Sequence, residues 1–309
     1  MTGKAKAIST LAALAVLVAC AEREAILPGE RLDVGALRDG SAAPELEGAR
    51  AIALPQVSRN AAWTQSPVSA ATRTVHPALS DAPQLAWRAT IGAGDSRRQR
   101  ITADPVVADG RVFTIDANHT LQATRTDGTP LWQASLVPPR DAPEQGQGGG
   151  LATADGRVFA ASGLGVLTAL DAETGETIWV QDLDNTATGA PSVADGLVYI
   201  TSGDRTAWAI EASDGRVRWQ IDGLGDVNNV AGAPAPAIGP QTVTFAFGDT
   251  SLQTAFRRGG VRLWRTTLTG RETGVARAAV DDVTGDPVIA GDRLYAGTHA
   301  GRSEEHTSE

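Results

Sequence analysis

From about residue 85 onward, hydrophobic and polar positions alternate in short runs that are separated by turn-forming residues. Such alternation with a period of two predicts β-strands. Residues 105–108 and 111–116 are predicted strands joined by Asp109-Gly110, a dipeptide that tolerates positive φ at both positions. Residues 166–171 are predicted to be the third strand of a similar unit. The pattern therefore predicts an all-β protein built of small antiparallel sheets.

The sequence repeats itself with a period of about 40 to 50 residues. Tryptophans close the successive units at spacings of 47, 40 and 45 residues, and Trp87 precedes the first of them by 45. Several short strands per unit at this period are typical of a β-propeller, in which each unit is a four-stranded blade. The units are residues 104–132, 151–179, 190–219 and 233–264, followed by the beginning of a fifth at 286–301.

Each closing tryptophan stands four residues after a glycine. The fixed interval predicts one repeated structural role, in which glycine permits a turn and the ring packs against the neighbouring blade. We predict that the last strand of each blade ends on its tryptophan. The pairs are Gly128 and Trp132, Gly175 and Trp179, Gly215 and Trp219, and Gly260 and Trp264.

The second unit holds the most complete copy of this pattern, in which Ala169, Asp171, Thr174, Gly175 and Trp179 have the spacing A-x-D-x-x-T-G-x-x-x-W. It resembles the tryptophan-docking motif of the pyrroloquinoline quinone (PQQ) type of eight-bladed β-propeller. This resemblance implies eight blades in the complete protein, which need roughly 350 residues. About four to five PQQ-like blades are present in this chain.

The chain starts with a positively charged segment and an uncharged, mostly apolar run at residues 7–19, which ends at the only cysteine, Cys20. The run is shorter than the about 20 residues that span a bilayer, so residues 1–20 are predicted to be a signal peptide. The tetrapeptide Leu-Val-Ala-Cys resembles the lipobox of bacterial lipoproteins. That resemblance implies that Cys20 carries diacylglycerol and an N-acyl chain, and Ala21 after it points to the outer membrane. The alternative is a small buried residue within an ordinary signal.

Three further regions complete the expected organisation. Residues 21–80 have no sustained period and are predicted to be a tether and an extended arm, with Trp63 packed on the body of the domain. Residues 81–301 are predicted to form the partial propeller, in which 85–91 is a candidate for the strand that completes the last blade. Residues 302–309 have no strand pattern and match the translation of a sequencing-library adapter; the alternative is a genuine polar tail.

Charge argues against one class of partner. The 27 Lys and Arg against 36 Asp and Glu give a formal net charge of -9, which repels a nucleic-acid backbone. We therefore expect no nucleic-acid partner.

Candidate chemistry is sparse. Asp182 and Asp184 begin a segment like a calcium loop, but the glycine and glutamate that such a loop needs at its sixth and twelfth places are missing, so a polar strand end is expected. The glycine run at 146–150 lacks the lysine of a phosphate loop and predicts close strand packing. We expect no catalytic residue, metal or cofactor. The histidines are isolated, at His76, His119, His299 and His306.

The combination of a lipobox, residues 26–32, PQQ-like blades, and the segments 228–238 and 281–297 resembles the BamB family, the lipoproteins of the outer-membrane β-barrel assembly (BAM) machinery. The resemblance implies a non-catalytic scaffold on the periplasmic face of the outer membrane. Its implied partners are the periplasmic POTRA domains of the central barrel protein, the companion lipoproteins, and unfolded outer-membrane proteins.

Partner contacts in that family lie on two rim loops. One carries an Asp-x-Asp pair, of which Asp282 matches and Thr284 does not; the alternative for Asp282 is a turn aspartate. The other loop falls near 226–229 and lacks the leucines and the arginine of the family. Two other functions stay open, a lipid-anchored periplasmic sensor or ligand-binding propeller, and a PQQ-dependent dehydrogenase.

Overall fold

The computed structural model describes residues 54–67, 69–70, 76–203, 205–224, 233–268, 282–298 and 303–307, all within one compact unit, 54–309. The predicted signal peptide, Cys20, most of the tether, the loop at 226–229 and His299 lie outside these residues. In the described part of the chain, no helix combines the length and the apolar character that a membrane span requires.

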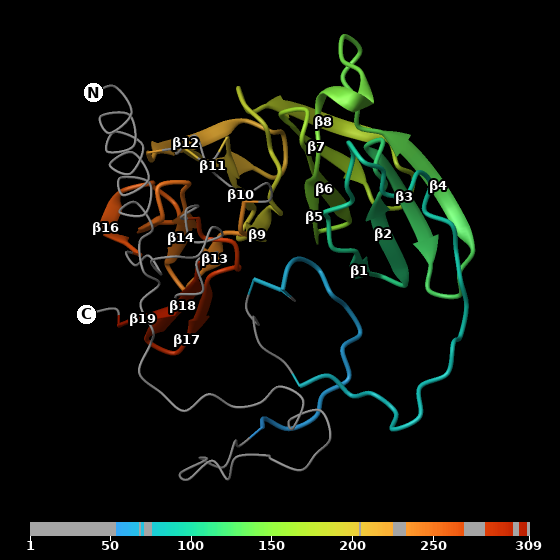
Figure 1. The fold of residues 1–309 in the computed structure, drawn as a ribbon, viewed down its shortest axis with the longest axis horizontal. Helices are drawn as coiled ribbons and strands as arrows, with labels where there is room; N and C mark the ends of the chain where they lie inside the picture. The colour runs from blue at the N-terminus through green and yellow to red at the C-terminus, as the bar shows by residue number, and fades with distance from the viewer. Residues whose placement is uncertain are drawn as a thin grey trace, which may run out of the picture. The chain divides into compact units, whose positions relative to one another are not determined.

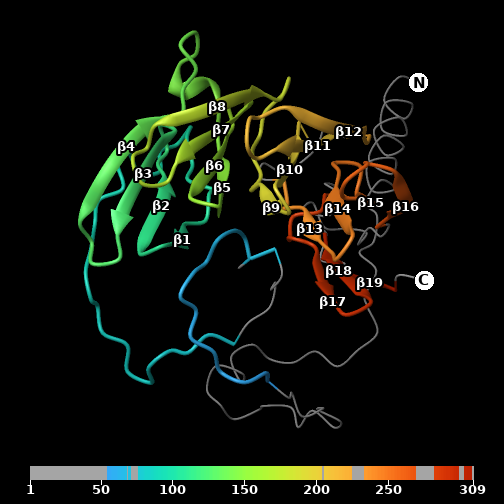
Figure 2. The same ribbon diagram turned by 180° about the vertical axis from the view of Figure 1, so that it is seen from behind.

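The strands form five antiparallel sheets that follow one another in sequence order, as Figures 1 and 2 show. Four of the sheets have four strands, and the fifth has three. The predicted propeller blades are therefore confirmed. The sheets consist of β1 (Val106–Ala108), β2 (Arg111–Ile115), β3 (Thr120–Arg125) and β4 (Pro130–Ser135); β5 (Gly149–Ala154), β6 (Arg157–Ser162), β7 (Val166–Asp171) and β8 (Thr177–Asp182); β9 (Ser192–Ala194), β10 (Leu197–Ser202), β11 (Thr206–Glu211) and β12 (Val217–Asp222); β13 (Ala237–Ile238), β14 (Thr242–Ala246), β15 (Ser251–Phe256) and β16 (Arg262–Thr267); and β17 (Val288–Ala290), β18 (Arg293–Gly297) and β19 (Ser303–Thr307). A short 3₁₀ helix, η1 (Pro143–Gln145), lies between the first two sheets.

The first hairpin of each of the first three sheets turns on an Asp-Gly dipeptide, as predicted. Both residues have positive φ, for example 48° and 72° at Asp109 and Gly110, and 50° and 74° at Asp195 and Gly196. This conformation matches the twist of the flanking strands and is readily adopted by aspartate and glycine.

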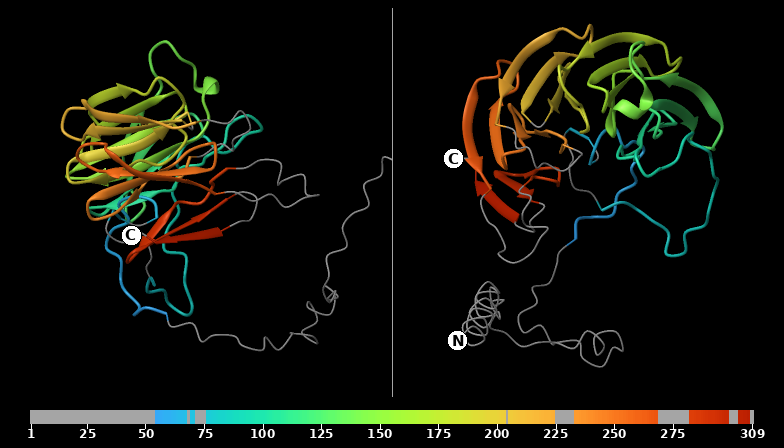
Figure 3. Two further views of the ribbon diagram at one scale, coloured as in Figure 1. Left: turned by 90° about the vertical axis from the view of Figure 1, so that its left-hand side faces the viewer. Right: turned by 45° about the horizontal axis from the view of Figure 1, so that its top comes forward.

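The hydrophobic core lies between neighbouring sheets, as four clusters. Phe159 and Trp208 belong to the cluster between the second and third sheets, and Tyr199 and Phe245 to the next. Burial of one such side chain contributes about 1.5 to 3 kcal/mol. The first strands of successive sheets also contact one another, from β1 to β5, β9, β13 and β17, so the sheets form a continuous series (Figure 3).

One predicted strand boundary is wrong. Trp132 is the third of six residues in β4, and Trp179 has the same place in β8, so the last strand continues beyond its tryptophan. The tryptophan pairs across the sheet with a small residue, Ala123 or Ala169, and the register shifts immediately after that residue. The small residue leaves room for the ring and the bulge turns the strand. These contacts lie between strands, and the alternation of residues within a single strand does not predict them.

The end of the described chain also differs from expectation. Ser303–Thr307 forms β19 and pairs antiparallel with β18, Arg293 opposite Thr307 and Gly297 opposite Ser303. The expectation that residues 302–309 form no strand is wrong for these five. Antiparallel pairing uses main-chain groups, which nearly every residue type supplies, so a segment without a hydrophobic pattern can extend a sheet edge. The adapter origin of this segment stays a prediction.

The segment at 85–91 is irregular and does not form the strand expected of it. Trp87 nevertheless reaches the first sheet, since a Cβ atom built on Gly128 would lie 3.2 Å from Cδ2 of its ring. Trp87 thus packs on the first blade as the later tryptophans pack on the blades that follow them.

The arm, residues 63–66, crosses the first strands of the sheets. Trp63 and Val107 exchange two main-chain hydrogen bonds, of 2.8 and 2.7 Å, and Thr64 O accepts a bond of 2.7 Å from Thr153 N. Oε1 of Gln65 accepts 2.9 Å from the main-chain N–H of Val193. The arm is therefore joined to β1, β5 and β9 in turn, and the main chain of Trp63 lies beside β1.

The arm then reaches the fifth sheet. The Ser66 hydroxyl donates to Oδ2 of Asp286 over 2.7 Å, across 220 positions of sequence, and Oδ1 of Asp286 accepts from Ala235 N over 2.7 Å. Residues 63–66 thus contact the first, second, third and fifth blades.

Candidate functional site

The tryptophan of one blade packs on the turn glycine of the next blade, and this contact connects successive blades. Each glycine has positive φ and lies directly under the ring of the tryptophan from the preceding blade, so any side chain there would collide with the ring. A Cβ atom would lie 2.6 Å from Trp132 Cδ2 at Gly175, 2.8 Å from Trp179 Cδ2 at Gly215, and 2.7 Å from Trp219 Cδ2 at Gly260.

The same rings are also held by hydrogen bonds. The indole Nε1 donates to a main-chain carbonyl of the next turn, over 3.3 Å from Trp132 to Ala172, 3.1 Å from Trp179 to Ala212, and 2.8 Å from Trp219 to Arg257. These three rings therefore pack against the neighbouring blade. Trp264 packs against the cluster between the fourth and fifth sheets.

Asp171 shapes the most regular of these turns. Its Oδ1 accepts hydrogen bonds from Glu173 N (2.9 Å), Thr174 N (2.8 Å) and the Thr174 hydroxyl (3.1 Å). These bonds hold the pKa of the Asp171 carboxyl below its usual value, and the main-chain bond from Thr174 has the largest effect. Asp171 is therefore a turn-forming residue, which supports its predicted structural role.

The turn at 256–260 in the fourth sheet departs from those of the second and third sheets, in which the residues before the glycine are acidic or small. Arg257 takes the place that Ala172 and Ala212 have in the second and third turns, because its N–H likewise donates to the hairpin beside it, to Gln241 O over 3.0 Å. The second turn carries Asp171, Glu173 and Glu176, the third Glu211, Asp214 and Arg216, and the fourth Phe256, Arg257 and Arg258.

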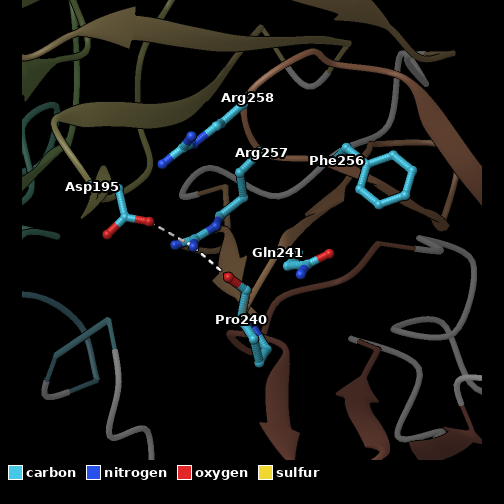
Figure 4. A pocket seen from close by; sticks show the side chains of 6 residues that line it. All are labelled: Asp195, Pro240, Gln241, Phe256, Arg257 and Arg258. Atoms are coloured by element: carbon cyan, nitrogen blue, oxygen red, sulfur yellow. Dashed lines mark hydrogen bonds and ion pairs between the residues drawn. The ribbon is translucent and has the colours of Figure 1, made fainter.

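A pocket of about 400 Å³ opens at this turn, between the third and fourth sheets (Figure 4). Nη2 of Arg257 forms an ion pair of 2.7 Å with Oδ2 of Asp195 and also donates to the carbonyl of Pro240. The Arg257 side chain is only 14% exposed, so its position is fixed. We name this feature the seam pocket, and it is lined by Asp195, Pro240, Gln241, Phe256, Arg257 and Arg258.

The seam pocket presents a cation and an aromatic ring to solvent. Arg258 is exposed and makes no hydrogen bond or ion pair with the described residues, and Phe256 is 42% exposed. In Figure 4 the two side chains lie on opposite sides of Arg257. The sequence prediction missed this site, although the loss of the acidic turn pattern at 256–260 was a usable signal.

A second pocket, of about 270 Å³, lies at the first strands of the blades beside the arm. It is polar and includes Asp104, Asp286 and Thr284, with Ser66 of the arm bonded to Asp286. Calcium takes six to eight oxygen ligands, and the described residues contain no group of three or more His, Cys, Asp and Glu side chains placed to hold a metal.

Asp282 is buried, with 7% of its surface exposed, and Val283 beside it bridges to Thr298. Asp282 has an interaction partner of its own, so little of its surface is left for a second protein. This position favours the turn role, and its partner-binding role stays a prediction.

His119 joins two blades. It is 2% exposed, its Nε2 lies 3.2 Å from Gly146 O, and its Nδ1 lies 3.1 Å from the Ser162 hydroxyl. The glycine run that follows packs closely, because a Cβ atom on Gly150 would lie 2.2 Å from the Cα of Ala190. The predicted close strand packing is confirmed, and the sequence did not reveal that His119 takes part in it.

Similar structures show the same fold. BamB from Moraxella catarrhalis is 18% identical with a TM-score of 0.57, over 66% of this chain and 60% of that one. Quinohemoprotein alcohol dehydrogenase from Comamonas testosteroni is 18% identical with a TM-score of 0.57, over 80% and 49%. A europium-containing methanol dehydrogenase is 16% identical with a TM-score of 0.58, over 80% and 58%. The chain thus spans about half to three fifths of the length of these proteins.

BamB and the two dehydrogenases share this fold, so sequence comparison is needed to assign the family. No curated protein matches the chain in sequence. The family described as outer membrane protein assembly factor BamB matches residues 117–307, which is more than half of the chain. On this match, the chain belongs to the BamB family of PQQ-like β-propellers.

Proposed function

We propose that this protein is a non-catalytic scaffold of the BAM machinery, held by lipid on Cys20 at the periplasmic face of the outer membrane. It docks on the POTRA domains of the central barrel protein, beside the companion lipoproteins, and assists outer-membrane proteins to fold and insert. The family match over residues 117–307 is the observation that carries this proposal.

The outer strands of the blades support a role in handling unfolded strands. β4, β8, β12 and β16 each stand at the outer edge of their sheet, with no further strand paired to them among the described residues. Apolar side chains on β8 are exposed, 42% at Ile178 and 58% at Val180. An edge with free main-chain groups and apolar side chains can pair with an extended segment of another chain.

The test is affinity capture of the full-length protein from detergent-solubilised outer membranes, followed by mass spectrometry. The central barrel protein and its companion lipoproteins should be retained in amounts comparable to the bait, and the bait should carry acyl chains on Cys20. A bait that emerges without these proteins would contradict the proposal. Bound quinone with calcium would then indicate a dehydrogenase, and another small ligand a periplasmic sensor.

A further inference from the structure

We propose that the seam pocket docks an extended segment of a partner protein that carries a carboxylate one or two positions away from an apolar side chain. The lining of this pocket does not include Asp282, and the proposal does not depend on the assembly role.

The first argument is the departure from the repeat. The turns at 171–175 and 211–215 form the blade contact with alanine at the place of Arg257, so the contact itself needs no long side chain there. The fourth turn keeps the contact and its glycine, yet replaces acidic and small residues by Phe256, Arg257 and Arg258. The side chains of Phe256 and Arg258 are therefore surplus to blade docking, whereas that of Arg257 adds an ion pair with Asp195 of the third blade.

The second argument is the geometry of the cations. Arg257 makes both of its bonds through Nη2, to Asp195 and Pro240, and its Nε and Nη1 make no hydrogen bond with the described residues. Because Asp195 balances the charge of Arg257, Arg258 is the cation left for a ligand. An arginine binds a carboxylate through paired N–H donors.

The third argument concerns the kind of ligand. Phe256 and Arg258 flank Arg257, so an occupant meets an aromatic surface at one end and a cation at the other (Figure 4). In an extended peptide, an acidic and an apolar side chain one or two positions apart can contact Arg258 and Phe256 together. A polyanion fits less well, because the neighbouring turns carry Asp171, Glu173, Glu211 and Asp214 and the chain has a net charge of -9.

The experiment measures fluorescence anisotropy of a labelled peptide, Gly-Ser-Asp-Gly-Leu-Ser-Gly, against the full chain. Arg258→Glu should weaken binding roughly tenfold or more, since it places a like charge against the carboxylate. Phe256→Ala should weaken it about tenfold through lost apolar contact. Peptides with Asn for Asp, or Gly for Leu, should bind correspondingly less well.

Two matched variants serve as controls. Arg140→Glu makes the same charge change at an exposed arginine outside the pocket, and Tyr295→Ala removes an aromatic side chain outside the pocket that is 39% exposed, close to the 42% of Phe256. Both should bind the peptide as the unchanged protein does, and circular dichroism should show all four variants folded. Equal weakening by Arg140→Glu, equal binding of the Asn peptide, or displacement of the peptide by a short oligonucleotide would overturn the proposal.

Discussion

Two buried glutamines show how much a single residue depends on its partners. Gln122 and Gln253 are each the third residue of their strand, in β3 and β15, and each is 1% exposed. Nε2 of Gln122 donates to Thr90 O (3.0 Å) and the Thr124 hydroxyl (2.9 Å), and its Oε1 accepts from Gln133 (2.6 Å). Neither amide atom of Gln253 has a hydrogen-bond partner in the part of the chain that the structure describes.

Gln253→Leu should therefore stabilise the protein by about 1 kcal/mol, because a buried polar group without hydrogen bonds costs about 1 to 3 kcal/mol. Gln122→Leu, at the equivalent place, should destabilise it by a similar amount, since it leaves the groups around it without their bonds. Urea unfolding of both variants checks the pair. If Gln253→Leu lowers the free energy of unfolding as Gln122→Leu does, the amide of Gln253 does not destabilise the folded protein.

Tyr199 should make stability depend on alkaline pH. Burial raises the pKa of its hydroxyl to about 12, from an ordinary value of about 10. Between these values the unfolded chain loses the proton while the folded protein keeps it, so stability present below pH 10 is lost as the pH rises toward 12. Tyr199→Phe should remove this loss, which urea unfolding across that range measures. An unchanged pH dependence in the variant would assign the effect to other groups.

At the level of the turn, a glycine can be needed for its positive φ or for the space that it leaves to a tryptophan ring, and the two needs can be measured separately. Gly215 and Gly196 both have positive φ, 77° and 74°, in the third blade. A Cβ atom at Gly215 would lie 2.8 Å from the ring of Trp179, whereas one at Gly196 would meet nothing within 4 Å. Conformation alone constrains Gly196, and conformation together with the ring constrains Gly215.

Gly196→Ala should cost about 1 to 2 kcal/mol, from the left-handed backbone alone. Gly215→Ala should cost about 1 to 3 kcal/mol more, because Trp179 must move from its place on the next blade. Thermal unfolding of the two variants gives the difference. Equal costs would mean that the ring shifts freely and that the interval of four residues has no packing role.

At the scale of the whole molecule, the arm connects blades that are far apart in sequence. Gln65 accepts a hydrogen bond from Val193, and Ser66 donates one to Asp286. Residues 63–66 thus bond to the first strands of the first three sheets and to Asp286, just before the fifth sheet. These bonds add to the contacts that each blade makes with its neighbours.

Gln65→Ala should leave the N–H of Val193 without its acceptor and speed its hydrogen exchange, with a loss of about 1 to 3 kcal/mol in stability. Amides within the β10 and β11 pair should exchange as before, because their bonds lie inside the third sheet. Exchange measured by NMR resolves the two groups. Unchanged exchange at Val193 would show that the arm does not protect this strand.

The blades and the Asp-Gly hairpins could be predicted from the amino-acid sequence, which also shows the interval of four residues between glycine and tryptophan. These features follow from alternation, turn chemistry and a fixed spacing, which act over a few residues and recur in successive units. The place of each tryptophan inside its strand and the pairing of β19 needed the sheet itself, because they depend on which main-chain groups of a neighbouring strand are available.

The path of the arm, the contact of His119 with the second blade, and the seam pocket follow from the packing of the folded chain. Ser66 and Asp286 are 220 positions apart, His119 and Ser162 are 43, and Asp195 and Arg257 are 62. No local pattern marks such pairs, because each partner is an ordinary polar residue in its own segment. They meet only when the packing of whole sheets brings their side chains to hydrogen-bonding distance.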